Sequence, residues 1–157
     1  MASRESAAFN IGKEDAHSGD LEGLVGYNLK RAYVVIRNDF RRALGDDGFA
    51  PRVFSALSLI VEYPNITQSE LARMLGIERS GLVAIVDELE SRGLLQRNAV
   101  PGDRRVQALA PTKKGKEAYA EASKAVQAHE DALLADMTDQ EKELLIQLLR
   151  KIRETGE

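Results

Sequence analysis

The most regular pattern of apolar residues lies in the middle of the chain, between residues 67 and 93. Thr67 is followed three residues later by Glu70, the spacing of a capping box, so a first helix is predicted to begin there. Gly76 stands where a left-handed residue would end that helix. A second helix is predicted over residues 79–92, because its apolar residues fall on one stripe: Leu82, Ile85, Val86 and Leu89. Two short helices joined by a tight turn containing glycine form a helix-turn-helix, whose second helix enters the major groove of DNA.

Two short β-prone segments follow, at residues 94–98 and 106–109. The connector between them contains Pro101 and Gly102 in sequence, a strong turn signal. We therefore expect a hairpin with Arg104 and Arg105 at or beside its tip. A helix-turn-helix with such a hairpin is a winged helix, and we assign residues 51–110 to this domain.

Helices are also predicted on both sides of this domain. Residues 1–19 are rich in serine, alanine, glycine and charge without periodicity, and we expect a disordered tail. Residues 21–44 carry an apolar stripe wider than one partner would cover. Pro51 precedes a helix over residues 52–63. Thr112 should cap a helix that reaches about residue 135 with mainly alanine inside, and Thr138 with Glu141 should cap the last helix.

The fold class that follows is mainly α with a small β-hairpin wing. The winged helix-turn-helix is embedded between two helical segments, residues 20–50 and 111–157. A core this small cannot bury the apolar faces of both segments. We therefore expect a two-fold homodimer in which the first and last helices of the two subunits interlock. The alternative is a monomer whose terminal helices pair with each other.

Composition narrows the function classes. The 157 residues contain no cysteine, which excludes disulfides, thiolate chemistry and cysteine-based zinc sites. No apolar run approaches a membrane span, and the N-terminus lacks the apolar core of a signal peptide, so we expect a cytoplasmic protein with no membrane role. The chain has no nucleophile elbow, phosphate-binding glycine loop or HExxH motif. We therefore expect neither an enzyme nor a metal or other cofactor.

Charge gives a mixed indication. The net charge of −3 argues mildly against a nucleic-acid partner. In the central stretch the arginines are matched in number by carboxylates, so DNA binding would depend on where the charges lie. Acidic residues on or near the second helix favour a rival function, a winged helix that binds another protein and not DNA: Glu78, Asp87, Glu88 and Glu90.

Five segments in series resemble the MarR family of bacterial transcription regulators. They are SELARMLGI, VDELESRGLL, Arg97, PGDRR and APTKKG, in the family's order and with its gaps. The resemblance implies a homodimeric DNA-binding regulator. Such a regulator is commonly a repressor that a small ligand, such as an aromatic acid or an acyl thioester, releases from DNA. The two-fold symmetry of a dimer implies an inverted-repeat operator in double-stranded DNA.

The exposed face of the second helix supplies the candidate DNA contacts. Arg79 could form a bidentate pair with guanine, and Ser80 could bind a phosphate or a base edge. Ala84 can touch only a thymine methyl group, and so can Val83. Together with Gly81 these residues depart from the polar or basic residues usual in the family. The alternative for Arg79 is a solvated residue at a helix start.

The wing supplies a second set of candidates. Arg104 or Arg105 should enter the minor groove, where arginine responds to groove width and negative potential. Asp87 and Asp103 need partners near the base of the wing. The resemblance pairs Asp87 with Arg105, which leaves Arg104 nearer the tip. Arg97 is a candidate phosphate contact or a solvated charge, and the whole tip could be only a soluble turn.

The ligand site is indicated by resemblance alone. It would lie between the first helix, the second helix and the alanine-rich helix. The candidate lining residues are Tyr33, Arg37, Phe40, Phe54, Leu57 and His129. Arg37 could hold a carboxylate and Tyr33 or His129 a hydroxyl. Ordinary core packing is the alternative for both phenylalanines. The absence of cysteine rules out thiol-based peroxide sensing.

Overall fold

The computed structural model describes residues 20–45, 48–100 and 102–156, with the backbone but not the side chains of Arg104 and Arg105. The chain divides into two units, Met1–Ile36 and Arg37–Glu157, and each is described by itself. The tail expected over residues 1–19 lies outside the described residues. None of the described helices is long and apolar enough to cross a membrane.

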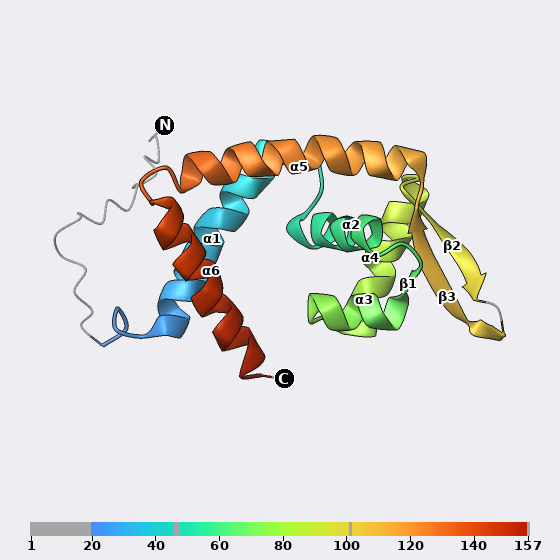
Figure 1. Cartoon of the computed structure of the whole chain (residues 1–157), viewed down its shortest axis with the longest axis horizontal. Coiled ribbons are helices and arrows are strands. Elements are labelled where there is room, and N and C mark those ends of the chain that lie inside the picture. Colours follow the sequence, from blue (N-terminus) through green and yellow to red (C-terminus); the bar gives the residue numbers. More distant parts are fainter. Residues whose placement is uncertain (1–19, 46–47, 101, 157) are drawn as a thin grey trace, which may run out of the picture. The chain divides into compact units, whose positions relative to one another are not determined.

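The fold is mainly helical with one small antiparallel sheet, which confirms the predicted class (Figure 1). The elements are α1 (Val25–Leu44), α2 (Pro51–Glu62), β1 (Ile66–Thr67), α3 (Gln68–Leu75), α4 (Arg79–Ser91), β2 (Leu95–Val100), β3 (Asp103–Pro111), α5 (Lys113–Leu133) and α6 (Asp139–Glu154).

The predicted helix caps are present. The Thr67 hydroxyl accepts from the Glu70 N–H at 3.3 Å, and a Glu70 carboxylate oxygen accepts from the Thr67 N–H at 2.9 Å. Thr138 and Glu141 form the same reciprocal pair at the start of α6. Gly76 ends α3 with a φ of +62°, a left-handed conformation that costs glycine little. These local signals therefore set the helix boundaries as the sequence indicates.

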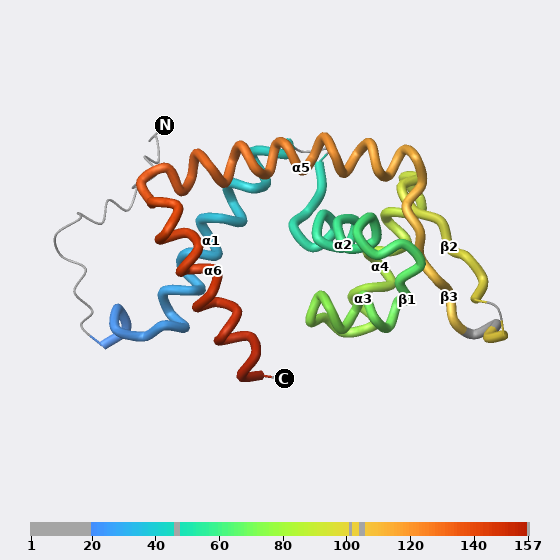
Figure 2. Tube along the Cα trace, in the orientation of Figure 1, coloured from blue at the N-terminus to red at the C-terminus, as the bar shows by residue number. Residues whose placement is uncertain are grey.

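A single core holds α2, α3, α4 and the sheet together. The stripe predicted on α4 is buried, and Leu82, Val86 and Leu89 are almost wholly inaccessible to solvent. They belong to the same apolar cluster as Leu57 and Ile60 of α2. Figure 2 shows the chain passing from α3 through a short turn into α4. This packing fixes the direction of α4 and leaves its opposite side exposed.

The sheet is larger than the sequence indicates. Its strand order is β1-β3-β2, and the two-residue strand β1 was not predicted. Strands β2 and β3 pair from Leu95 opposite Pro111 to Val100 opposite Asp103, so the hairpin is longer than expected. The hairpin extends away from the helices of the winged domain (Figure 1). Arg104 and Arg105 therefore belong to β3, directly after the turn and not within it.

The start of α5 packs closely against the residues directly before β2, at the base of the wing. Thr112 caps α5 as predicted, and its hydroxyl accepts from the Gly115 N–H at 3.0 Å and donates to the Gly93 carbonyl at 2.7 Å. A Cβ atom on Gly115 would lie 1.9 Å from the Leu94 carbonyl oxygen. Only glycine permits this approach of helix and strand, because any side chain would collide with the backbone.

The terminal helices keep apolar side chains exposed. In α6 no residue is buried, and its large apolar residues are open to solvent: Leu144, Leu145, Ile146, Leu148, Leu149 and Ile152. Within α1 only Phe40 is buried. Helix α1 begins at Val25 and not at Leu21, because residues 20–23 form a turn before it. The exposed apolar residues of these helices form continuous faces, whereas the surface of a monomeric protein usually exposes such residues singly.

The capping box of α3 should make stability depend on pH. The Thr67 N–H donates to the Glu70 carboxylate and lowers the pKa of Glu70 below its ordinary value of 4.5. A lowered pKa stabilises the fold above the unfolded-state value, and this stabilisation disappears as pH falls through the folded-state pKa. Glu70→Gln should therefore destabilise the protein at about pH 7 and have little effect at about pH 3 in urea unfolding.

Glu121→Gln is the matched control, because Glu121 is exposed on α5 and caps no helix. Equal destabilisation by Glu70→Gln at both pH values would contradict the capping role of the ionised carboxylate.

Candidate nucleic-acid interface

Helices α3 and α4 form the helix-turn-helix expected from the sequence. The turn is fixed by Gly76 and by the Ile77 N–H, which donates to the Ala72 carbonyl at 3.1 Å. The residues of α4 opposite the buried stripe are all exposed: Arg79, Ser80, Gly81, Val83 and Ala84. The chain thus presents the first two turns of α4 to solvent, as a helix that reads a groove requires.

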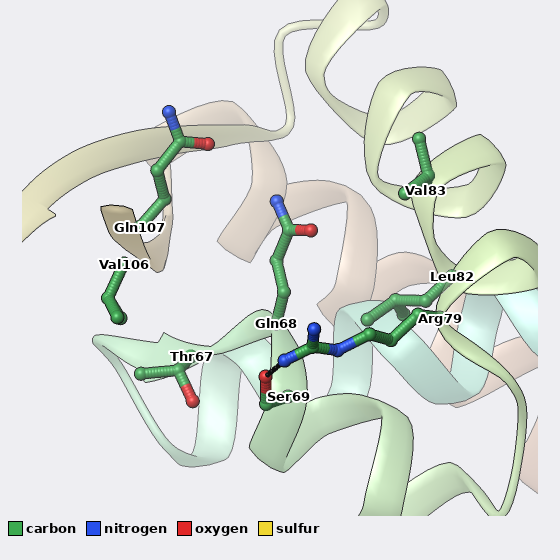
Figure 3. Close-up of a pocket in the computed structure, with 8 residues that line it drawn as sticks. All are labelled: Thr67, Gln68, Ser69, Arg79, Leu82, Val83, Val106 and Gln107. Carbon is green, nitrogen blue, oxygen red and sulfur yellow. Dashed lines mark hydrogen bonds between the residues drawn. The ribbon is translucent and has the colours of Figure 1, made fainter. Parts of the chain in front are cut away.

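A hollow of about 490 Å³ lies between the starts of α3 and α4 and strand β3 (Figure 3). It is lined by Thr67, Gln68, Ser69, Arg79, Leu82, Val83, Val106 and Gln107. Arg79 donates from Nη2 to the Ser69 hydroxyl oxygen at 2.5 Å. Gln68, Ser69 and Gln107 were not expected at this hollow. Their positions, at the start of α3 and in β3, are the only feature of the sequence that could have indicated them.

The carboxylates of α4 are held by arginines. Arg97 of β2 forms ion pairs with Asp87 and, at 3.4 Å, with Glu90. Glu88 pairs with Arg92 at 3.4 Å. The Arg97 side chain is 26% exposed, while the side chains of Asp87 and Glu90 are 56% and 43% exposed. Three of the four acidic residues that the sequence places on or near α4 are therefore paired with an arginine, whose positive charge compensates their own.

The ligand candidates fall into different environments. Phe40 and Phe54 meet edge to face with ring centroids 5.7 Å apart. The side chain of His129 is 6% exposed, and its Nδ1 lies 2.5 Å from an Asp39 carboxylate oxygen. Arg37 is exposed. Phe40, Phe54 and His129 thus form a compact aromatic group between α1, α2 and α5, within the second unit.

Two further ligand candidates differ from this group. Leu57 is fully buried in the core of the winged domain, and its place in a ligand pocket stays a prediction. Its place on the apolar face of α2 serves packing. Tyr33 belongs to the first unit and is exposed. Tyr119 was missed, and its hydroxyl accepts from Ser58 at 3.3 Å, while its ring stacks at a tilt on Phe54, 5.8 Å away.

Metal chemistry finds no support in the described part of the chain. No group of three or more histidine, aspartate and glutamate side chains there could hold a metal ion.

Comparison with known proteins identifies the family. The MarR family model matches residues 47–106. A putative transcriptional regulatory protein for the hcr operon of Thauera aromatica is 32% identical over 135 residues, 85% of this chain and 81% of that protein. The transcriptional repressor CouR, bound to a 23-mer DNA duplex, superposes with a TM-score of 0.82 at 38% identity, over 86% of this chain and 96% of that one.

The chain belongs to the MarR family. The resemblance drawn from its five sequence segments is therefore confirmed, and the protein is a winged-helix transcriptional regulator. A second structure is that of CouR from Rhodococcus jostii RHA1 bound to p-coumaroyl-CoA. It has a TM-score of 0.76 at 27% identity and covers 84% of this chain and 93% of that one.

The structure of this MarR-family chain gives Arg97 two carboxylate partners, Asp87 and Glu90. A phosphate contact was one expectation for Arg97, and it stays a prediction. Asp87 pairs with Arg97, and its expected pairing with Arg105 stays a prediction. The side chains of Arg104 and Arg105 lie outside the described residues, and their roles stay predictions. Asp103 is the first residue of β3, opposite Val100.

The pairing of Arg97 with Asp87 should be measurable as a coupling free energy. Either single substitution, Arg97→Ala or Asp87→Ala, removes the contact between these two charges, while Arg97 keeps Glu90 in Asp87→Ala. The double variant should therefore be less destabilised than the sum of the singles, by about 1 kcal/mol. Urea unfolding of the four proteins measures this difference.

The exposed pair of Lys113 and Glu117, 3.9 Å apart, is the control. A cycle on that pair should give a coupling near zero, because water screens both charges. Strict additivity at Arg97 and Asp87 would show that their contact does not hold the wing to α4.

Proposed function

We propose that this MarR-family regulator binds double-stranded DNA as a homodimer and represses transcription until a small ligand releases it. One observation carries the proposal: α4 presents an exposed face that begins with Arg79, while its carboxylates at Asp87, Glu88 and Glu90 are engaged by arginines. A helix so arranged can approach a polyanion although the chain is acidic overall. The likeness to CouR, whose structure contains a DNA duplex, supports this.

Each half of the dimer would read one half-site. Arg79 would contact a guanine, Ser80 a phosphate or base edge, and Ala84 a thymine methyl group. Two-fold symmetry would place the two α4 helices about 34–36 Å apart, one turn of DNA, on an inverted repeat. Arg104 and Arg105 follow the turn of the wing, where one of them would enter the minor groove.

The exposed apolar faces support the dimer. Helix α6 has no buried residue, and its leucine and isoleucine side chains remain open to solvent. A second copy of α1 and α6 would cover such faces, as expected for an isologous interface. The segments 20–50 and 111–157 would then form the dimerisation region, and residues 51–110 the DNA-binding domain.

The ligand we propose is an aromatic acid or its acyl thioester. The CouR structure with p-coumaroyl-CoA supports this class. Phe40, Phe54 and His129 gather where α1, α2 and α5 meet, and Arg37 is exposed on α1 three residues before Phe40. Aromatic rings can stack on a phenyl group, His129 can bond a hydroxyl, and Arg37 can bind an anionic group. The ligand would act by favouring a dimer whose reading helices are wrongly spaced.

The rival function is a winged helix that binds another protein. It drew its support from the acidic residues near α4, and the pairing of Asp87, Glu88 and Glu90 with arginines weakens that support. We propose that the protein catalyses no reaction and that it acts in the cytoplasm. A gel shift at low salt with the region upstream of the protein's own gene separates the two functions. No shift with any duplex would favour the protein-binding module.

Replacing Arg104 by alanine should weaken binding to every duplex. Loss of one cation from the DNA contact releases fewer counterions, so the slope of log affinity against log salt should flatten by about one unit. Fluorescence anisotropy over a range of salt concentrations, with specific and unrelated duplexes, measures both effects. Lys124→Ala, a loss of charge on the exposed surface of α5, is the control and should leave the slope unchanged. An unchanged slope in Arg104→Ala would exclude Arg104 from the DNA contact.

The protein–DNA complex should respond differently to an acyl thioester and to the corresponding free acid. We expect p-coumaroyl-CoA to dissociate the protein–DNA complex at lower concentration than p-coumarate does. His129→Ala should raise the concentration required by about tenfold, the effect of losing one hydrogen bond of about 1.4 kcal/mol. Ser55→Ala, which alters an exposed hydroxyl on α2, is the control. Dissociation by neither compound would reject this ligand class, and an unchanged response in His129→Ala would exclude the histidine from the site.

A further inference from the structure

Arg79 does not point freely into solvent from the start of α4. Its side chain reaches the start of α3, and Nη2 donates to the hydroxyl oxygen of Ser69 at 2.5 Å (Figure 3). Ser69 is the second residue of α3, ten positions earlier in the chain. The contact therefore joins the two helices of the helix-turn-helix, and both of its residues line the hollow.

The chemistry of the acceptor matters. Arg97 is held by carboxylates, which compensate its charge. No ion pair within the described part of the chain involves Arg79, and its contact with Ser69 is to a neutral oxygen. The serine thus restricts the direction of the guanidinium and leaves its positive charge intact. A guanidinium carries five N–H donors, so the donors not given to Ser69 remain for a ligand.

Positioning of this side chain has a large effect because three of its exposed neighbours on α4 cannot replace it. Gly81, Val83 and Ala84 are exposed but offer no side-chain hydrogen bond. A bidentate contact with guanine requires the planar guanidinium in one orientation. A free arginine side chain must lose much of its rotamer freedom to reach that orientation, and a side chain already held loses less.

We infer that Ser69 is a positioning residue for Arg79, so that the base specificity of α4 depends on a hydroxyl in the preceding helix. The inference rests on the proposed DNA-binding function. It assigns Ser69 an effect on discrimination between bases, exerted through Arg79. A Ser69 hydroxyl that only bound a phosphate would strengthen binding to all sequences alike.

The test begins with duplexes selected by the wild-type protein from a random library. Fluorescence anisotropy then measures the affinity of each variant for the selected duplex and for duplexes with single base pairs exchanged. Arg79→Ala should identify one base pair per half-site at which discrimination falls by about tenfold. Ser69→Ala should reduce discrimination at that same pair by about threefold. Ser69→Thr, which keeps the hydroxyl, should retain it.

The double variant separates positioning from an independent contact. If Ser69 acts through Arg79, adding Ser69→Ala to Arg79→Ala should change discrimination no further. Ser55→Ala is the matched control, an exposed serine of α2 whose hydroxyl donates only to the Pro51 carbonyl among the described residues. Thermal unfolding of each variant checks that the fold is retained.

Three results would overturn the inference. Ser69→Ala could weaken all duplexes equally, its effect could multiply independently with that of Arg79→Ala, or the sensitive base pair could differ from that of Arg79. Each of these would leave the proposed function standing. Failure of the wild-type protein to enrich any duplex would instead reject the proposed function, and the role of Ser69 with it.

Discussion

A helix that carries several carboxylates repels DNA less when cations of the same protein pair with them. In this chain Arg97 engages Asp87 and Glu90, and Arg92 engages Glu88. Because Arg97 lies on β2, the same ion pairs also attach the wing to the helix that it flanks. Arg97 therefore contributes both to the charge of α4 and to the placement of the hairpin, and the proposed interface depends on it.

The apolar core makes this arrangement possible. Leu82, Val86 and Leu89 are almost wholly buried, in one cluster with residues of α2, α3 and the sheet. A helix buried on one stripe has a fixed rotation about its axis, so Arg79 and its exposed neighbours are held on the opposite side. Packing thus decides which residues of α4 are available, and the ion pairs decide the charge they present.

The structural features that depend on a few neighbouring residues were predictable from the sequence. The capping boxes at Thr67 and Thr138, the left-handed Gly76 and the stripe of α4 depend on local spacing, and the structure has them all. The contacts that bridge elements were not predictable. The partner of Asp87 and the contact between Ser69 and Arg79 each depend on how a helix turns toward another element ten residues away. Strand β1 was missed because two residues are too few to show a period, and its pairing partner, Leu109, is far along the chain.

The close approach at Gly115 has a mechanical consequence. The backbone of α5 rests against the Leu94 carbonyl with no side chain between them, and the Thr112 N–H donates to the same carbonyl at 3.0 Å. Flexible side chains can absorb small displacements, but a junction of backbone on backbone has almost no slack. His129 lies on the same helix, fourteen residues beyond that junction. If α5 tilted near His129, the base of the hairpin would consequently move by almost the same amount.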